Sequence, residues 1–450
     1  MDPNEFHRVL LESLINEMHP VNPNSCGSPA HLSRRTLLKW GALGGVTWLT
    51  PLATALAREQ ETAPRGRPAK SVILLWMAGG PSQLETFDPH PGKTIAHGSQ
   101  AIKTAQRGVL LGQGLERTAG FMKDISLIRS VVSKEADHER AVYNVKTGYR
   151  PNPTVVHPSI GAVICHQLTD DTLDIPRHIS ILPESWPARG GYLGAQFDAF
   201  QVYDPQGPIQ DVSATVESHR MKQRMSNLEV VEKAFAVGRP LNLESNRTLH
   251  QLSMTRALRI MSSAQLSAFD VKLAPARQRA AYGDTPFGRG CLAALRLIET
   301  GVRCVEVTLS GWDTHVNNHT QQRRNINILD PAMAALIGDL KERGLLESTI
   351  VLCGGEFGRT PKLNPLEGRD HWPYGFSVAV AGGGFRGGLI KGATDPEGIK
   401  KEPSDPVRVE DLHATIQHAL GIDPEKELMT PVGRPLTLSD GRVLRDLLSG

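Results

Sequence analysis

Short apolar runs that stop at glycine or polar residues recur along the chain. The first, Ser71–Met77, is followed by Gly79, Gly80 and Pro81. A short, continuously apolar run that ends at glycines indicates a strand of a parallel sheet, because such strands are covered on both faces. Five later runs have a similar pattern: Ile125–Val132, His178–Leu182, Cys304–Leu309, Thr349–Gly354 and Ser377–Gly382.

Helical patterns separate several of these runs. Glu139–Thr147 and Phe287–Thr300 each end directly before a glycine, which is a common helix stop. Asp330 followed by Pro331 predicts a helix that starts there with a cap and a proline and that ends at Gly344. Two further helices are predicted at Pro158–Leu168 and Leu412–Leu420. Strands that alternate with helices predict a three-layer α/β/α sandwich with a central, mostly parallel sheet.

The segment Val212–Ala280 differs from the rest of the chain. It is polar, has a helical pattern and contains no convincing strand. We therefore expect a helical insertion at about residues 212–280, or a cap over the sheet. Residues Arg58–Lys70 are polar and rich in proline, which predicts a linker before the first strand. The main domain is accordingly expected to span residues 71–450.

The N-terminal residues carry a targeting pattern. Arg34 and Arg35 precede Trp40–Ala57, a stretch without charged residues that ends in Ala-Leu-Ala. These features predict a twin-arginine signal over residues 1–57, cleaved after Ala57, with an uncleaved anchor as the alternative. We therefore expect the twin-arginine export machinery as a partner and a location in the periplasm or another extracytoplasmic compartment. Glycines and a proline inside the stretch argue against a stable transmembrane span after cleavage.

The composition narrows the classes of function. Of the 450 residues, 40% are hydrophobic and 22% are charged, which is typical of a globular protein and excludes a disordered or multi-span membrane chain. The 50 basic and 47 acidic residues give a net charge of +3, and the basic residues are scattered, which argues against nucleic acid as a partner. The cysteines lack paired spacing, so those beyond the signal region are expected to be buried free thiols.

Carboxylates, imidazoles and two arginines gather where the predicted strands end. In chain order they are His138, Arg140, Asp313, His315, Glu356, Arg359, Asp370 and His371. Open α/β sheets bind ligands at the carboxyl ends of their strands. Carboxylate and imidazole together form a ligand set for Zn²⁺, Mn²⁺ or Mg²⁺. We therefore expect Asp313, His315, Glu356, Asp370 and His371 to converge in one cleft. The alternative is a solvated loop rim whose polar groups make structural hydrogen bonds.

Several longer motifs resemble a known family. They are GGPSQLETFDP from Gly79, the helix that starts HER and ends at Thr147-Gly148, GWDTH from Gly311, GEFGRTP from Gly355 and GRDHWP from Gly368. Together they resemble the exported bacterial family called domain of unknown function 1501, which is assigned to the alkaline phosphatase–sulfatase superfamily. The resemblance covers roughly residues 70–425 and implies an alkaline phosphatase-like fold.

The resemblance implies that one metal site of the superfamily is complete. Asp313, His371 and either His315 or His319 match its ligands, and the ion would be Zn²⁺, Mn²⁺, Mg²⁺ or Ca²⁺. The second metal site is incomplete, because Gly79-Gly80 stands where the first strand usually ends in an aspartate. An Asp-His pair is likewise replaced by Glu356-Phe357. Two carboxylates that follow the first strand, Glu85 and Asp88, are candidates to reach back to the site.

The resemblance also implies a reaction class, namely metal-dependent hydrolysis of a phosphate or sulfate ester. Under this hypothesis Arg140 or Arg359 would hold an anionic group of the substrate. His138, at a helix start in the neighbourhood of the usual nucleophile, would act as an unconventional nucleophile or as an acid/base. Two alternatives stay open: a pseudoenzyme that binds sulfated or phosphorylated glycans without turnover, and a structural envelope protein with a relic cleft.

Overall fold

The structure is a computed structural model, and it describes residues 68–170, 172–207, 209, 212, 216–236 and 249–449. The predicted signal region, residues 1–57, lies outside the described residues, as does the linker up to residue 67. Among the residues that are described, no helix has both the length and the apolar character required to cross a bilayer.

A nine-stranded sheet forms the centre of the described chain, in the order β12-β4-β11-β8-β1-β7-β5-β6, with β13 beside β4. The strands are β1 Ser71–Met77, β4 Ile125–Val132, β5 His178–Ile181, β6 Phe200–Val202, β7 Cys304–Leu309, β8 Thr349–Gly354, β11 Phe376–Ala381, β12 Ile390–Lys391 and β13 Val407–Arg408. Only β11 is antiparallel to its neighbours, β4 and β8, and the other pairs of this sheet are parallel. The predicted mostly parallel sheet is confirmed.

The central strand β1 shows why the strands appear as unbroken apolar runs. Its residues face alternately to the two sides of the sheet, and Ile73 and Leu75 pack into one core whereas Val72 packs into the other. In the register of the sheet, Ile73 lies between Val305 of β7 and Val351 of β8. Because helices cover both faces, no polar alternation remains in the sequence of the strand.

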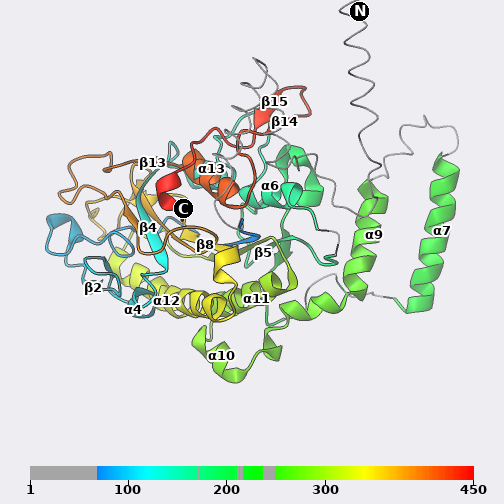
Figure 1. Cartoon of the computed structure of the whole chain (residues 1–450), viewed down its shortest axis with the longest axis horizontal. Coiled ribbons are helices and arrows are strands. Elements are labelled where there is room, and N and C mark those ends of the chain that lie inside the picture. Colours follow the sequence, from blue (N-terminus) through cyan, green and yellow to red (C-terminus); the bar gives the residue numbers. More distant parts are fainter. Residues whose placement is uncertain are drawn as a thin grey trace, which may run out of the picture. The chain divides into compact units, whose positions relative to one another are not determined.

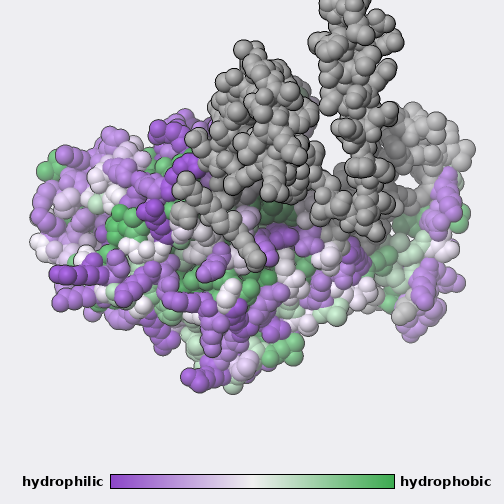
Figure 2. Space-filling view, in the orientation of Figure 1, coloured by the Kyte–Doolittle hydropathy of each residue, from purple (hydrophilic) through white to green (hydrophobic). Residues whose placement is uncertain are grey.

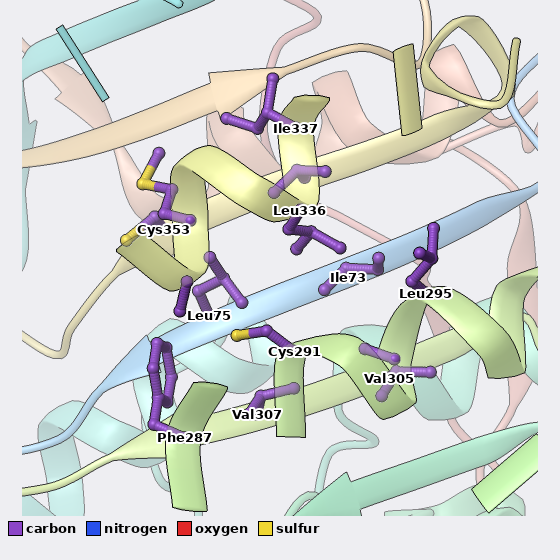
Figure 3. Packing of buried hydrophobic residues seen from close by; sticks show 14 of the residues in the cluster. Ile73, Leu75, Phe287, Cys291, Leu295, Val305, Val307, Leu336, Ile337 and Cys353 are labelled. Atoms are coloured by element: carbon purple, nitrogen blue, oxygen red, sulfur yellow. The ribbon is translucent and has the colours of Figure 1, made fainter. Parts of the chain in front are cut away.

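Helices form a layer on each face of the sheet (Figure 1). One layer contains α4 Glu116–Ala119, α11 Pro286–Thr300 and α12 Asn318–Glu342; the other contains α5 His138–Thr147, α6 Ile160–Gln167 and α13 Val409–Ala419. Figure 3 shows the first interface, where Cys291 of α11 lies between Leu75 and Val307, and Leu336 of α12 lies beside Ile73. The predicted α/β/α sandwich is therefore confirmed.

The predicted start of one helix was wrong. Helix α12 begins at Asn318, not at Asp330, and contains Pro331 in its interior. Asp330 caps a different helix, because its carboxylate accepts hydrogen bonds from the backbone N–H groups of Arg117 and Thr118 at 3.0 and 2.7 Å. The carboxylate of Asp330 therefore caps the N-terminus of α4 and not that of the helix in which Asp330 lies.

The described residues also form smaller hairpins and further helices. Three small hairpins are formed by β2 Ala101–Lys103 with β3 Leu110–Gly112, β9 Gly358–Arg359 with β10 His371–Trp372, and β14 Glu427–Met429 with β15 Pro435–Thr437. The other helices within the described residues are α7 Ser218–Ala236, α9 Leu249–Ser262, α10 Ala276–Ala281 and the short 3₁₀ segments Thr94–Ala96, Gly191–Leu193, Ala195–Phe197, Ala264–Phe269, Val271–Leu273, Leu346–Ser348 and Arg445–Leu447.

The described part of the segment 212–280 is helical. Its second half contacts the helix layer: Arg296 of α11 donates to the carbonyl of Ala268, and Gln278 of α10 donates to Asp339 of α12. A position of this segment above the carboxyl edge of the sheet stays a prediction.

The cysteines beyond the signal region are in the state that their spacing in the sequence predicts. Cys165, Cys291, Cys304 and Cys353 are buried and unpaired, as expected, and burial raises the pKa of the Cys165 thiol to about 12. These thiols are therefore protonated and unreactive at neutral pH. On the face drawn in Figure 2, hydrophilic residues are interspersed with smaller hydrophobic patches.

Candidate active site

The loops that follow β1, β7 and β8 meet at one edge of the sheet. These strands are parallel neighbours, so their carboxyl ends lie side by side. In the hairpin of β9 and β10, His371 pairs with Arg359, and this pairing places His371 beside the loop that follows β8. His138, the first residue of α5, completes the group and contacts Glu356.

A glycine turn after β1 permits this close approach. Gly79 and Gly80 have φ angles of +110° and +75°. A Cβ on Gly79 would lie 2.5 Å from the backbone nitrogen of Asp313, and one on Gly80 would lie 2.5 Å from the ring of Phe357. The turn therefore requires glycine, and the backbone of Asp313 and the ring of Phe357 fill the space that a side chain would need.

Three ligand atoms converge on one point. Asp313 Oδ1 lies 3.0 Å from His315 Nε2 and 3.3 Å from His371 Nε2, and the two imidazole nitrogens are 3.0 Å apart. Ligand atoms around a tetrahedral zinc ion, with bonds of about 2.0–2.1 Å, are separated by about 3.3 Å. The spacing of these three atoms therefore fits a common metal ion.

The opposite nitrogen of each imidazole is held by a protein oxygen. His315 Nδ1 lies 2.8 Å from Asp370 Oδ1, and His371 Nδ1 lies 2.7 Å from the carbonyl oxygen of Ala136. Metal-binding histidines usually donate their other N–H group to a carboxylate or a backbone carbonyl in this way. These contacts leave both Nε2 atoms directed toward Asp313 Oδ1, and they place Asp370 against His315 Nδ1.

A second set of possible ligands overlaps with the first. One ligand atom each of His138, Asp313 and His371 lie within 4.8 Å of one another. His138 Nε2 is 3.3 Å from Asp313 Oδ2. The set with His315 has the shorter spacings. In both sets protein oxygens hold the Nδ1 atoms of the two histidines.

His138 is bound at its inner nitrogen by Glu356. The Nδ1 atom lies 2.8 Å from Glu356 Oε1, which also accepts a hydrogen bond from Gly79 N–H at 2.9 Å. Glu356 is buried, and its Oε2 atom has no hydrogen-bond partner in the described part of the chain. Hydrogen bonds to Asp313 and Glu356 raise the pKa of His138 to about 9. The residue lies in the wall of the cleft, and its Nε2 atom is directed toward Asp313 Oδ2.

Arg359 lies beneath the site and is fully buried. Its guanidinium donates to the carbonyls of Gly79, Gly80 and Arg369, and to Asp313 Oδ1 at 2.6 Å. Burial raises the pKa of Asp313, but hydrogen bonds from His138, His371 and Arg359 outweigh it and lower that pKa well below its usual range. Arg140, the other arginine predicted to bind an anion, is exposed and donates to Glu135 at 2.8 Å. The guanidinium groups of both arginines are therefore bound by groups of the protein.

Residues 69–448 match a family model described as "Protein of unknown function (DUF1501)". The chain belongs to this family. The resemblance stated from the sequence motifs is therefore confirmed over almost the whole described chain. No curated protein matches the sequence.

Solved structures similar to this DUF1501 chain have low identity. The PsFucS1 sulfatase from Pseudoalteromonas sp. is 11% identical, with a TM-score of 0.38, over 84% of this chain and 72% of that one. A protein in the alkaline phosphatase superfamily from Vibrio parahaemolyticus is 10% identical, with a TM-score of 0.38, over 86% and 72%. The C-terminal periplasmic domain of EcEptC from Escherichia coli, in complex with Zn, is 10% identical, with a TM-score of 0.37, over 85% and 96%. None of these similarities assigns a role to a residue here.

Three candidates from the sequence have their partners elsewhere: Glu85 and His319 contact each other, and Asp88 contacts Thr394. His319 Nδ1 and Arg369 Nη2 are each 3.1 Å from Glu85 Oε1, and Asp88 accepts a hydrogen bond from Thr394 Oγ1 at 2.7 Å. Burial raises the pKa of Glu85, but the hydrogen bond with His319 and the charge of Arg369 together lower it to about 2. His315, and not His319, therefore joins Asp313 and His371, and Glu85 and Asp88 do not reach back to the site.

Two supporting residues were not predicted from the sequence. Phe357, considered only as a lost imidazole, places its ring centroid 4.9 Å from that of His138 and 4.4 Å from that of His371. Gln83 bonds to both the N–H and the carbonyl of Arg359, at 2.9 and 2.8 Å. The contacts of Phe357 with His138 and of Gln83 with Arg359 join residues more than 200 positions apart, so no local motif could have indicated them.

Proposed function

We propose that this protein is an exported hydrolase of phosphate or sulfate esters that works with one divalent metal ion. The observation that carries the proposal is the mutual spacing of 3.0–3.3 Å among Asp313 Oδ1, His315 Nε2 and His371 Nε2. Imidazole and carboxylate ligands suit Zn²⁺ and Mn²⁺ among the divalent ions. The motifs that resemble the alkaline phosphatase–sulfatase superfamily supply the reaction class.

Asp313, His315 and His371 would hold the ion. When bound, it would polarise an ester oxygen or activate a water molecule. Asp370 and the carbonyl of Ala136 fix the tautomers of the two histidines by holding their Nδ1 atoms. Arg359 positions Asp313 and the glycine turn, which is the role we propose for it in place of the anion-binding role expected from the sequence.

His138 is the proposed acid/base residue. Glu356 binds its Nδ1 atom and so directs Nε2 toward Asp313 at the wall of the cleft, from where it would donate a proton to the leaving oxygen of the ester. A carboxylate that orients a histidine in this way is a recurrent arrangement in hydrolytic sites. Attack by His138 on the substrate, as a nucleophile, is the variant of the same geometry that the sequence left open.

Metal analysis and turnover test the proposal together. We expect purified protein to bind about one Zn²⁺ or Mn²⁺ per chain and to hydrolyse an activated aryl phosphate or aryl sulfate. We expect His371→Ala to lose both properties, since two ligand atoms cannot hold the ion tightly. The measurements are elemental analysis by mass spectrometry and release of the aryl alcohol.

Asp370→Asn is the matched variant, because it leaves all three ligand atoms in place and removes only a support of His315. It should weaken metal affinity by roughly 10–100-fold without abolishing it. Metal binding without turnover, combined with binding of sulfated or phosphorylated glycans, would replace the hydrolase with the non-catalytic binding protein. A protein that takes up neither metal nor anion would leave only the structural envelope protein.

Export by the twin-arginine machinery is a separate part of the proposal. It depends on Arg34 and Arg35, and on the stretch Trp40–Ala57 with its Ala-Leu-Ala ending. Replacing both arginines by lysine is expected to leave an uncleaved precursor in the cytoplasm, which cell fractionation and N-terminal sequencing will detect. Normal export of that variant would contradict the assignment of the signal.

A further inference from the structure

A cavity of about 220 Å³ lies against helix α5, beside the cleft of the candidate active site. We call this space the α5 cavity. Three residues, Val142, Lys146 and Trp186, belong to its wall and also to the wall of the cleft. Pockets that bind small molecules are lined mainly by apolar and aromatic side chains. The wall of the α5 cavity has such a lining, which consists of Val142, Val156, Trp186, Pro187 and Ala188.

The polar groups in the interior of this wall are bound within the protein. Lys146 donates to Glu306 at 2.9 Å, and Thr147 Oγ1 donates to the carbonyl oxygen of Tyr143 at 2.8 Å. The hydroxyl of Tyr143 accepts a hydrogen bond from the backbone N–H of His157 at 2.7 Å. The Nδ1 atom of His157 is itself buried, so it is not accessible from the cavity. A polar ligand would therefore find few partners in the interior, whereas an apolar one needs none.

The charges in the wall compensate one another. Glu139 and Arg189 form no ion pair with another residue of the described chain, but both are exposed, so water solvates them. Their charges are opposite, and the charge of Lys146 is offset by Glu306 at 2.9 Å. Burial lowers the pKa of His157, so this ring is neutral at pH 7. The wall therefore has no net charge that would select an anion or a cation.

Hydrogen bonds hold the two loops of the wall in place. The backbone N–H of Tyr192 donates to the carbonyl oxygen of Val156 at 2.8 Å, and Lys146 donates to that of Trp186 at 3.2 Å. Even so, 57% of Val156 and 38% of Trp186 stay exposed. A ligand that covers these two side chains would remove apolar surface from water without having to order the loops first.

We propose that the α5 cavity binds a single uncharged aromatic ring. An engineered apolar cavity of about 150 Å³ binds benzene. The α5 cavity, at about 220 Å³, therefore has room for a benzene ring with a small substituent. The ring would lie against Trp186, because aromatic pairs contribute free energy beyond the burial of their area.

Two sources share this chemistry. The ring can be the aryl half of an ester whose other half lies in the neighbouring cleft, or it can belong to a free aromatic compound that binds beside the active site. The inference goes beyond the proposed function and does not depend on it, because the cavity and its lining are the same whether or not the cleft hydrolyses an ester.

Other occupants match the wall less well. A sugar ring would bring hydroxyl groups into an interior whose polar groups already have protein partners, and unpaired buried hydroxyls are unfavourable. A phosphate, sulfate or carboxylate would meet Glu139 together with Arg189, so the attraction to one is opposed by the other. A saturated ring would cover the same apolar surface but would lack the ring–ring interaction with Trp186.

Binding of fluorobenzene, followed by ¹⁹F NMR titration of the purified protein, tests the inference. We expect saturable binding that is stronger than that of fluorocyclohexane. Val156→Asp should weaken it about tenfold or more, because the ligand would then desolvate a carboxylate. Trp186→Ala should weaken it about tenfold, and Trp186→Phe should restore most of the affinity, since phenylalanine keeps an aromatic face. Both positions are exposed, and circular dichroism will confirm that the variants fold.

The matched control is Val432→Asp, the same substitution at a valine that is 61% exposed and lies outside the cavity. It should leave the binding of fluorobenzene unchanged, as should Arg189→Gln. Absence of saturable binding, or equal binding by wild type and a folded Val156→Asp variant, would overturn the inference. Benzoate should bind no more tightly than fluorobenzene. Tighter binding of benzoate that Arg189→Gln removes would make the cavity an anion site and would also overturn the inference.

Inhibition kinetics distinguish the two sources of the ring. If the ring belongs to the ester, fluorobenzene should raise KM for an aryl phosphate and leave kcat unchanged. If the ring belongs to a separate compound, fluorobenzene should leave KM unchanged and alter kcat. Either effect should disappear in Val156→Asp and persist in Val432→Asp. The titration itself needs neither metal nor turnover, so failure of the proposed hydrolysis would leave its result unaffected.

Discussion

His138→Gln is expected to lower kcat/KM for an aryl phosphate or aryl sulfate by about 10²–10⁴-fold while leaving the metal content at the wild-type level. The expected loss is that of a positioned acid/base residue. Glutamine keeps a hydrogen-bonding side chain opposite Glu356 but cannot transfer a proton. The metal should stay bound, because Asp313, His315 and His371 are unchanged. Steady-state kinetics and elemental analysis of the same preparation measure the two quantities.

The control for this variant is His219→Gln, an exposed histidine of α7 whose described ion pair is with Glu217. It should change neither the activity nor the metal content. Loss of metal in His138→Gln would instead identify His138 as a ligand, in agreement with the overlapping set of His138, Asp313 and His371. Full activity in His138→Gln would exclude both roles and would restrict the chemistry to the residues around Asp313.

Much of the fold was predictable because burial on both faces of the sheet leaves a strong local signal. β1, β4, β7 and β8 have the boundaries that their apolar runs predicted, and α5 begins one residue before the predicted start. The start of α12 could not be predicted in this way. Asp330 and Pro331 form a plausible local cap, but the carboxylate satisfies the N-terminus of α4, more than 200 residues earlier in the chain.

The grouping of the site was predictable from the strand ends, whereas the roles within it were not. Parallel strands bring their carboxyl ends together, so Asp313 and Glu356 had to lie near each other. The choice between His315 and His319 depends on partners in distant loops, Asp370 for the one and Glu85 for the other. No pattern of residues along the chain encodes such a choice.

Arg359 shows the same limit most clearly. An arginine in a polar loop at a strand end suggests a binding group for a substrate anion, since guanidinium binds phosphate and sulfate in bidentate fashion. Its partners are the backbone carbonyls of Gly79, Gly80 and Arg369. Because every residue has a backbone carbonyl, the sequence does not indicate which of them an arginine will bind. The structure therefore makes this residue part of the frame that fixes Asp313.

Arg359→Ala is accordingly expected to lower the free energy of unfolding by about 1–3 kcal/mol, the cost of leaving buried polar groups without a partner. The substitution would remove one counter-charge of Asp313, which is partly exposed, and would take the guanidinium donors away from the carbonyls of Gly79 and Gly80. Arg359→Lys should recover only part of this loss, because an ammonium group cannot make the same set of fixed contacts. Urea-induced unfolding of the three proteins, followed by circular dichroism, measures the difference.

Arg140→Ala is the matched comparison, since it removes an exposed guanidinium that is paired with Glu135. We expect its unfolding midpoint to stay within error of the wild-type value, as is usual for exposed ion pairs. The opposite pattern would restore the anion-binding role for Arg359. In that case Arg359→Ala would keep the stability of the protein and lose affinity for inorganic phosphate or sulfate, and the guanidinium would have to leave its carbonyl partners when substrate binds. Stability and anion affinity, measured on the same variant, therefore separate a residue that holds Asp313 in place from one that holds the substrate.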